Sequence, residues 1–400
     1  MFRMNLVEFT LTAVARHTAG VHYVRRGGTR NSPAFDLAYV RGNRGGNGPP
    51  VVVIPGGPGL GSVLPYRTLR ALAVRAGVDL IMVEHRGVGI SRHDLAGNDL
   101  PPSAMNVASV VDDIAAVLDR EGIDQAIIVG SSYGSYVASC FGVAYPERVA
   151  GMLLDSALQS ANHLDLERAV IRALFWEGDT AITAQVHKLV SSGIEERTLL
   201  DVARSAYELG GTDLLLPVLQ SRIRHKSSPA WWALERYSTR DASLTSFPAI
   251  YEFDLVGTIA FRELGYGAPQ DGLPLDPALT YSNLAARYPP FGGELYDLSH
   301  EIKKFDWPLI LLSGAHDLRT PPAIARHIAE TAPDAVLVPI ENGHSALDTH
   351  PVVLLNAIRW LAAGRHRDLP GIAAQLNELP RRGFAARLPA LLHTALRFGG

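Results

Sequence analysis

The chain has 400 residues, 47% of them apolar, which is enough to bury one large core or one core with a substantial insertion. Its formal net charge of -3 gives no general reason to expect nucleic acid or an anionic membrane surface as a partner. The single cysteine, Cys140, excludes an internal disulfide and fits a reducing compartment.

The beginning of the chain shows no targeting segment. Residues 1–18 contain Glu8 and several polar side chains where a secretory signal needs an unbroken apolar stretch. No window offers the ~18 uninterrupted apolar residues of a transmembrane helix. The sequence therefore predicts a soluble, cytoplasmic protein.

Short apolar runs alternate with helical patterns from residue 35 onward. Strands are expected at residues 35–41, 50–55, 79–84, 125–130, 149–155, 308–314 and 335–340. Helices are expected at residues 66–76, 107–121, 133–145, 322–331 and 351–363. The glycine-rich residues 42–48 are expected to form a hairpin loop after the first of these strands. This alternation predicts an α/β fold, a mostly parallel sheet with helices on both faces.

One long connection breaks the alternation, between the strand ending near Asp155 and the strand starting at Pro308. Connections of this length are far longer than ordinary loops. Apolar residues recur at helical spacing within it, at 164–177, 182–192 and 195–209. We therefore expect residues 157–303 to form a mostly helical cap.

Three units follow from this division of the chain. The core comprises residues 1–156 and 304–364, and the cap is inserted between its two parts. The remainder, residues 365–400, is rich in arginine and has an amphipathic pattern around residues 388–396. We expect this tail to be helical, packed on the core and with a solvated basic face.

The most informative motif is Gly130-Ser131-Ser132-Tyr133-Gly134, between an apolar run and a run of small residues. A strand, G-x-S-x-G and a helix together are typical of the nucleophile elbow of an α/β-hydrolase. The turn is so sharp that side chains at Gly130 and Gly134 would collide with neighbouring backbone. The motif predicts Ser132 as the nucleophile.

A serine hydroxyl needs a base within hydrogen-bond reach, and the base needs an orienting acid. Asp317 follows the apolar run 309–314, and His344 follows the run 336–340, in the chain order serine, acid, histidine. Both lie at the carboxyl ends of expected strands, where ligands collect in open α/β sheets. The sequence predicts that Ser132, His344 and Asp317 form a catalytic triad.

Other interpretations of these residues remain open at this stage. Asp317 is also a possible helix N-cap before Pro321, and Asp155 ends the other strand that can supply the acid in this fold. His344 is alternatively an ordinary loop histidine.

An oxyanion hole requires two backbone N–H groups aimed at the developing charge. The Tyr133 N–H, directly after the nucleophile, is expected to be the first. The second is expected from the glycine-rich turn 55–59, with Gly57 preferred over Gly56 because Pro58 fixes the turn. The alternative, a phosphate-binding loop, lacks the Lys-Ser/Thr ending of a P-loop.

Taken together, these motifs resemble the proline iminopeptidase and tripeptidyl aminopeptidase branch of the α/β-hydrolases. The likeness is carried by PGGPG at 55–59, EHRGVGIS at 84–91, GSSYG at 130–134, GAHDLRTP at 314–321 and NGH at 342–344. The resemblance implies a serine peptidase that releases N-terminal residues. Pro55 stands where the family usually has histidine, and Glu84 where it has aspartate.

Aminopeptidases of this branch recognise a free α-amine through acidic residues in the cap, as the resemblance implies. The candidates for substrate binding are Glu252 and Asp254, with Glu177 and Tyr251 as further candidates. A carboxylate pair binds an ammonium group strongly in a site of low dielectric constant. Alternatively, these acids are ordinary surface residues, and the aromatic side chains near Tyr251 form the core of the cap.

The expected function is therefore an aminopeptidase acting through an acyl-enzyme. The alternatives are a carboxylesterase or lactonase of a small acyl substrate, and a binding protein with a hydrolase fold. An epoxide hydrolase or dehalogenase would need an aspartate at the position of Ser132. No cofactor and no metal site are expected, since His22, His85 and His93 show no paired ligand spacing. The expected partner is a small molecule or short peptide, with no nucleic acid and no membrane, and the oligomeric state is left open.

Overall fold

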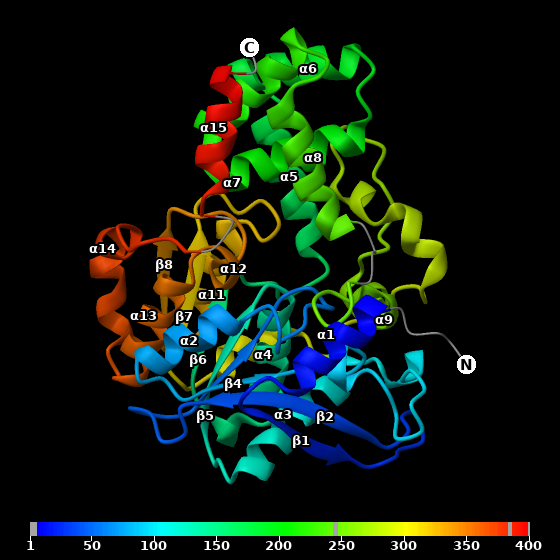
Figure 1. Cartoon of the computed structure of the whole chain (residues 1–400). Helices are drawn as coiled ribbons and strands as arrows, with labels where there is room; N and C mark the ends of the chain where they lie inside the picture. The colour runs from blue at the N-terminus through cyan, green and yellow to red at the C-terminus, as the bar shows by residue number, and fades with distance from the viewer. Residues whose placement is uncertain (1–5, 243–246, 383–385, 399–400) are drawn as a thin grey trace.

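The computed structural model describes residues 6–242, 247–382 and 386–398. An eight-stranded sheet with the order β1-β2-β4-β3-β5-β6-β7-β8 runs through this part of the chain (Figure 1). The strands are β1 (Val21–Arg26), β2 (Phe35–Gly42), β3 (Val51–Ile54), β4 (Leu80–Val83), β5 (Ala126–Ser131), β6 (Val149–Asp155), β7 (Leu309–Gly314) and β8 (Ala335–Ile340).

The central strands form the parallel part of the sheet, and the first two strands form its antiparallel edge. Every residue of β3, β5 and β7 is buried, as expected for strands covered on both faces. β2 pairs with both β1 and β4 in antiparallel fashion. The predicted α/β fold with a mostly parallel sheet is confirmed.

The prediction of a hairpin loop over residues 42–48 is wrong. β4 lies between β2 and β3 in the sheet, so the two strands that this loop joins are not hydrogen-bonded to each other. β1 has no clear signal in the sequence either, because only part of its surface is buried and its residues are largely polar.

Side chains alternate along the strands between two apolar layers. Val52 and Ile54 pack into one cluster, whereas Val51 and Val53 pack into the other, as the period of two in a strand requires. The first layer is covered by α3 (Val107–Glu121), α4 (Tyr133–Ala144) and α11 (Pro322–Thr331). The second is covered by α2 (Arg67–Arg75) and α13 (Pro351–Ala362).

The long connection between β6 and β7 is largely helical. It contains α5 (His163–Phe175), α6 (Ala181–Ser191), α7 (Glu196–Arg224), α8 (Pro229–Ala242), α9 (Phe253–Leu264) and α10 (Leu298–Glu301). Helices α5 to α8 share an apolar cluster of their own and stand above the sheet in Figure 1. α7 is interrupted at Gly210 and Gly211, whose backbone angles are not helical. Within the described residues, no helix combines the length and apolarity needed to cross a bilayer.

The tail differs from its prediction, because α15 (Leu388–Phe398) packs on the cap and not on the core. Leu388 and Leu392, one helical turn apart, are buried in the apolar cluster that α7 and α8 also form. Only the earlier part of the tail packs on the core, through Leu369 and Leu376.

The close approach at the β5–α4 turn leads to a first prediction. A Cβ atom on Gly130 would overlap the main chain of Gly134 and Ser135, and backbone cannot move aside as a flexible side chain does. We expect Gly130→Ala to destabilise the protein by ~3 kcal/mol or more in urea unfolding. Gly371→Ala is the matched control, because nothing lies within 4 Å of the new methyl group. Equal unfolding midpoints for the two variants would contradict this explanation.

Candidate active site

The nucleophile elbow has the strained geometry that its sequence predicts. Ser132 adopts φ 54° and ψ -122°, between the end of β5 and the start of α4. A Cβ atom on Gly134 would overlap the carbonyl groups of Ile54 and Pro55, just as one on Gly130 would overlap Gly134. Glycine at both positions therefore lets β3, β5 and α4 meet closely enough to present Ser132 above the sheet.

Ser132, His344 and Asp317 form one hydrogen-bonded chain. Ser132 Oγ lies 2.8 Å from His344 Nε2. The other ring nitrogen, His344 Nδ1, lies 3.0 Å from both carboxylate oxygens of Asp317. This arrangement allows the imidazole to take a proton from the hydroxyl while the carboxylate holds the ring in place.

Asp317 is kept ionised by its surroundings. Burial alone would raise the pKa of this carboxyl, but the charge of His344 and the hydrogen bonds from His344 and Thr320 outweigh it, so the pKa lies below its usual range. Thr320 donates twice, from its backbone N–H at 3.0 Å and from its hydroxyl at 2.8 Å.

The pKa of His344 is shifted in the opposite direction, upward. Burial would lower the pKa of the imidazole, but the adjacent charge and hydrogen bond of Asp317 raise it above its ordinary value. The carboxylate thus favours the imidazolium ion that forms when the ring takes a proton.

Asp155, the alternative acid, has another role. Its carboxylate accepts hydrogen bonds from the hydroxyl of Ser131 at 2.7 Å and from the N–H groups of Ala346 at 3.0 Å and Leu347 at 2.9 Å. Burial raises its pKa to about 6. Asp155 therefore fixes the backbone directly after His344 and is not the hydrogen-bond partner of its ring.

The glycine-rich turn lies beside the nucleophile. A Cβ atom on Gly56 would come within 3.3 Å of Ser132 Cβ, which places Gly56 next to Ser132 and Gly57 one residue farther along. In the described structure no hydrogen bond engages the backbone N–H of Gly57 or Tyr133. Both amides are candidates for the oxyanion hole, as is that of Gly56.

Two polar residues, the buried Glu84 and the partly buried His85, hold segments beside this turn and beside Ser132. The carboxylate of Glu84 accepts the N–H groups of Ser62 and, at 3.0 Å, of Val63, and burial raises its pKa to about 7. His85 Nε2 lies 2.9 Å from the hydroxyl of Tyr133 and so anchors the side chain that follows the nucleophile.

The predicted amine-binding acids lie apart from the triad or are already engaged. Asp254 makes a bidentate ion pair with Arg92, at 2.7 and 2.9 Å, and Glu252 accepts the backbone N–H of Gly89 and Ala249. Glu177 is exposed just beyond the end of α5. Tyr251 forms a β-bridge with Leu60, so its segment packs on the glycine-rich turn.

The cap contributes other acids near the triad that the sequence did not single out. The backbone of Glu208 on α7 is in close contact with Gly343, the residue before His344, and its carboxylate lies 3.4 Å from Arg319 Nε. Glu167 on α5 pairs with Arg204 at 3.3 Å, and burial raises its pKa to about 7. Helical spacing on α5 and α7 gives no sign of this proximity, because it arises from how the cap docks on the core.

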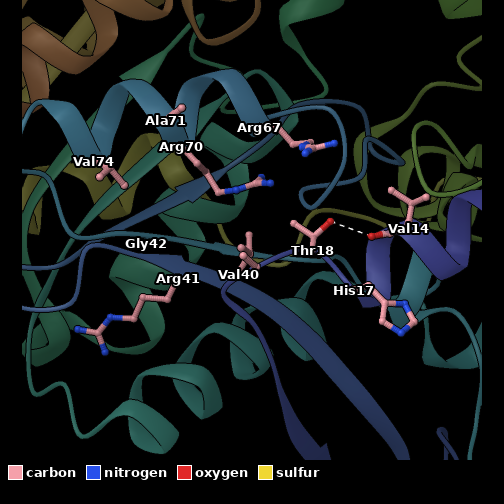
Figure 2. A pocket seen from close by; sticks show the side chains of 11 residues that line it. Val14, His17, Thr18, Val40, Arg41, Gly42, Arg67, Arg70, Ala71 and Val74 are labelled. Carbon is pink, nitrogen blue, oxygen red and sulfur yellow. Dashed lines mark hydrogen bonds between the residues drawn. The ribbon is translucent and has the colours of Figure 1, made fainter.

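A groove of about 560 Å³ lies elsewhere, between α1 (Leu6–Arg16), α2 and β2. Figure 2 shows Arg67 and Arg70 on one of its walls and Val14, His17 and Thr18 on another. None of the triad or oxyanion-loop residues lines it.

The elbow, the glycine-rich turn and the strand order together define an α/β-hydrolase fold. The sequence profile of the alpha/beta hydrolase fold family matches residues 49–351, and the chain belongs to this family. A proline iminopeptidase of Neisseria gonorrhoeae is 22% identical over 306 residues, which cover 76% of this chain and 84% of the relative.

Two further proteins resemble this chain, one over a short segment and the other over most of its length at low sequence identity. A 2-hydroxy-6-oxo-6-phenylhexa-2,4-dienoate hydrolase of Comamonas testosteroni is 31% identical over 113 residues, or 28% of this chain and 37% of the relative. The crystal structure of a proline iminopeptidase of Mycobacterium smegmatis has a TM-score of 0.52 at 16% identity, covering 87% of this chain and 99% of that one. At this identity the structure supports the fold alone.

The pKa directions in the triad predict a pH profile. In the predicted triad the neutral form of His344 is the base, so reaction of Ser132 with a fluorophosphonate should rise with pH, with a midpoint above the ordinary histidine value of about 6.5. Asp317→Asn removes the charge that raises the pKa of His344, so the midpoint should move to lower pH, with a loss of rate of about 10⁴-fold. An unchanged midpoint in this variant would contradict the assignment of Asp317.

Proposed function

We propose that this chain is a serine hydrolase in which Ser132 attacks, His344 transfers the proton and Asp317 orients the imidazole. The observation that carries the proposal is the continuous chain of hydrogen bonds from Ser132 Oγ through His344 to Asp317. Backbone N–H groups of Tyr133 and Gly57 stabilise the oxyanion, and the acyl-enzyme on Ser132 is then hydrolysed by water.

The substrate that best fits the site is a peptide or aminoacyl amide with a free N-terminus. Support comes from the motifs at residues 55–59, 84–91 and 130–134 and from the similarity to a proline iminopeptidase over most of both chains. Glu208, with Glu167 behind it, replaces Glu252 and Asp254 as the proposed amine-binding carboxylate, because it lies against the loop of His344. A carboxylate there stabilises an ammonium group a short distance from the scissile carbonyl.

A second candidate is a hydrolase of small acyl esters or lactones. It is favoured by the ion pair of Glu208 with Arg319, since a carboxylate that already has a cationic partner is a weaker site for a substrate amine. The same triad chemistry serves both substrates, so the cap decides between them.

The serine mechanism is tested by Ser132→Ala. Loss of the nucleophile should lower kcat on the order of a millionfold on any substrate that the wild-type protein cleaves, because the hydroxyl and imidazole act as a unit. Fluorophosphonate labelling followed by peptide mass mapping should identify Ser132. A wild-type protein that neither labels nor turns over a substrate would support a binding protein instead.

Amine recognition is tested with an alanyl or prolyl arylamide, its N-acetylated form and a short-chain acyl ester. Glu208→Gln should raise KM for the free-amine arylamide about tenfold or more and leave KM for the ester unchanged, because only the first carries an ammonium group. Asp213→Asn is the matched control, an exposed acid farther along α7. Equal cleavage of free and acetylated arylamides would reject the aminopeptidase, and turnover of the ester alone would establish the second candidate.

A further inference from the structure

The C-terminal tail lies outside the family match, which ends at residue 351. Its described part contains a 3₁₀ helix, η7 (His366–Ile372), followed by α14 (Ala373–Asn377) and α15. In Figure 1 this segment leaves the core beside β8, and α15, drawn in red, lies against the cap beside α7. The tail is therefore fixed to both parts of the molecule.

The first half of the tail forms a platform on the core. Leu369 and Leu376 are buried in one of the two apolar layers of the sheet. His366 Nε2 lies 2.8 Å from the carboxylate of Asp334, directly before β8. These contacts give the following residues a fixed position relative to the carboxyl end of β8.

Asn377 and Arg381 of the tail make hydrogen bonds to the loop that carries His344. Asn377 Oδ1 accepts the backbone N–H of Glu341 at 2.8 Å. The Arg381 guanidinium donates to Asn342 Oδ1 at 2.8 Å and to the carbonyl of Glu341. Glu341 and Asn342 lie three and two residues before His344.

Asn342 connects Arg381 with Gly343, the residue before His344. Its side chain is buried, and Nδ2 lies 3.3 Å from the carbonyl oxygen of Gly343, to which it donates. On its other side, Gly343 approaches Glu208 so closely that a Cβ atom would overlap the backbone of α7. The residue before His344 is thus held between Asn342 and the cap helix.

The second half of the tail supports that cap helix. α15 inserts Leu388 and Leu392 into the apolar cluster of the cap, whereas Leu391, to one side of this buried stripe, is 56% exposed. Burial of the two leucines holds α15 on α7 and α8. The tail therefore contacts the histidine loop directly at Glu341 and Asn342. It also supports α7, which packs against the same loop at Gly343.

From these contacts we propose that the C-terminal tail positions His344 for catalysis, with Arg381 as the positioning residue and α15 as its anchor on the cap. The inference rests on the proposed serine hydrolase function, since it concerns the base of that triad. Arg381 touches neither substrate nor reacting atoms and acts through Asn342 and Gly343. A tail that held only the fold together would stabilise the protein without affecting the chemical step.

The experiment measures inactivation by a fluorophosphonate, which reports activation of Ser132 whatever the natural substrate is. Arg381→Ala should lower kinact about tenfold with an unchanged inhibitor KI, because a displaced imidazole slows the chemical step and not probe binding. Arg381→Lys, which keeps a charged donor, should stay within about threefold of wild type. Arg382→Ala, at the exposed neighbouring position, should react as wild type does.

Wild-type kinact in Arg381→Ala would overturn the positioning role. That role would also be overturned if Arg381→Ala lowered kinact and melting temperature together and Arg381→Lys restored neither. Absence of labelling in the wild-type protein would overturn the serine hydrolase and this inference together, whereas normal wild-type labelling with an unaffected Arg381→Ala protein would overturn this inference alone.

The anchor is tested independently, so the proposal does not depend on whether Arg381→Ala folds. Leu392→Glu should release α15, seen as faster tryptic cleavage after Arg387, and should lower kinact about tenfold. Leu391→Glu places the same charge on the exposed face of the helix and should change neither. If Leu392→Glu released α15 but kept the wild-type kinact, the role of α15 as an anchor for the histidine loop would be overturned.

Discussion

A close contact between backbones fixes the position of the proposed catalytic groups in this protein. Where β5 turns into α4, Gly130 and Gly134 let the turn approach the end of β3 at Ile54 and Pro55. This contact sets Ser132 at a positive φ and brings the glycine-rich turn alongside it. Strain of this kind persists only where the surrounding structure enforces it, here the fully buried parallel strands β3 and β5. The Ser132 hydroxyl and the backbone N–H groups proposed as oxyanion donors are therefore positioned by the fold itself.

Buried carboxyl groups around this turn differ in role because their surroundings differ. Asp317 accepts several hydrogen bonds and faces a histidine, so it remains a charged partner of the base. Asp155 and Glu84 bind backbone N–H groups, yet burial outweighs these bonds and raises their pKa values. Asp317 holds the ring of His344, whereas Asp155 and Glu84 hold the backbone at Ala346 and Val63.

The parts of the site that depend on local sequence were predictable. Ser132 and Asp317 follow buried apolar strands, and His344 follows the partly buried apolar strand β8. Parallel strands bring their carboxyl ends to one edge of a sheet. The roles of Glu252 and Asp254 were not predictable in this way. Their partners, Gly89 and Arg92, are distant in sequence, and no periodic pattern reveals an ion pair formed when a cap folds back on its core. The same reason explains why the tail was expected on the core, since an amphipathic helix fits any apolar groove.

The contacts between cap and core connect the cap to the proposed catalytic residues. The backbone N–H of Glu252, in the cap, donates to the carbonyl of Gly59 in the glycine-rich turn at 2.9 Å. The backbone of α7 packs closely against Gly343, next to His344. Farther along α7, Gly211 approaches the ring of His316, next to the acid. The cap thus contacts the glycine-rich turn and the segments next to His344 and Asp317. Side chains that set how the cap docks on these segments therefore also shape the surroundings of His344.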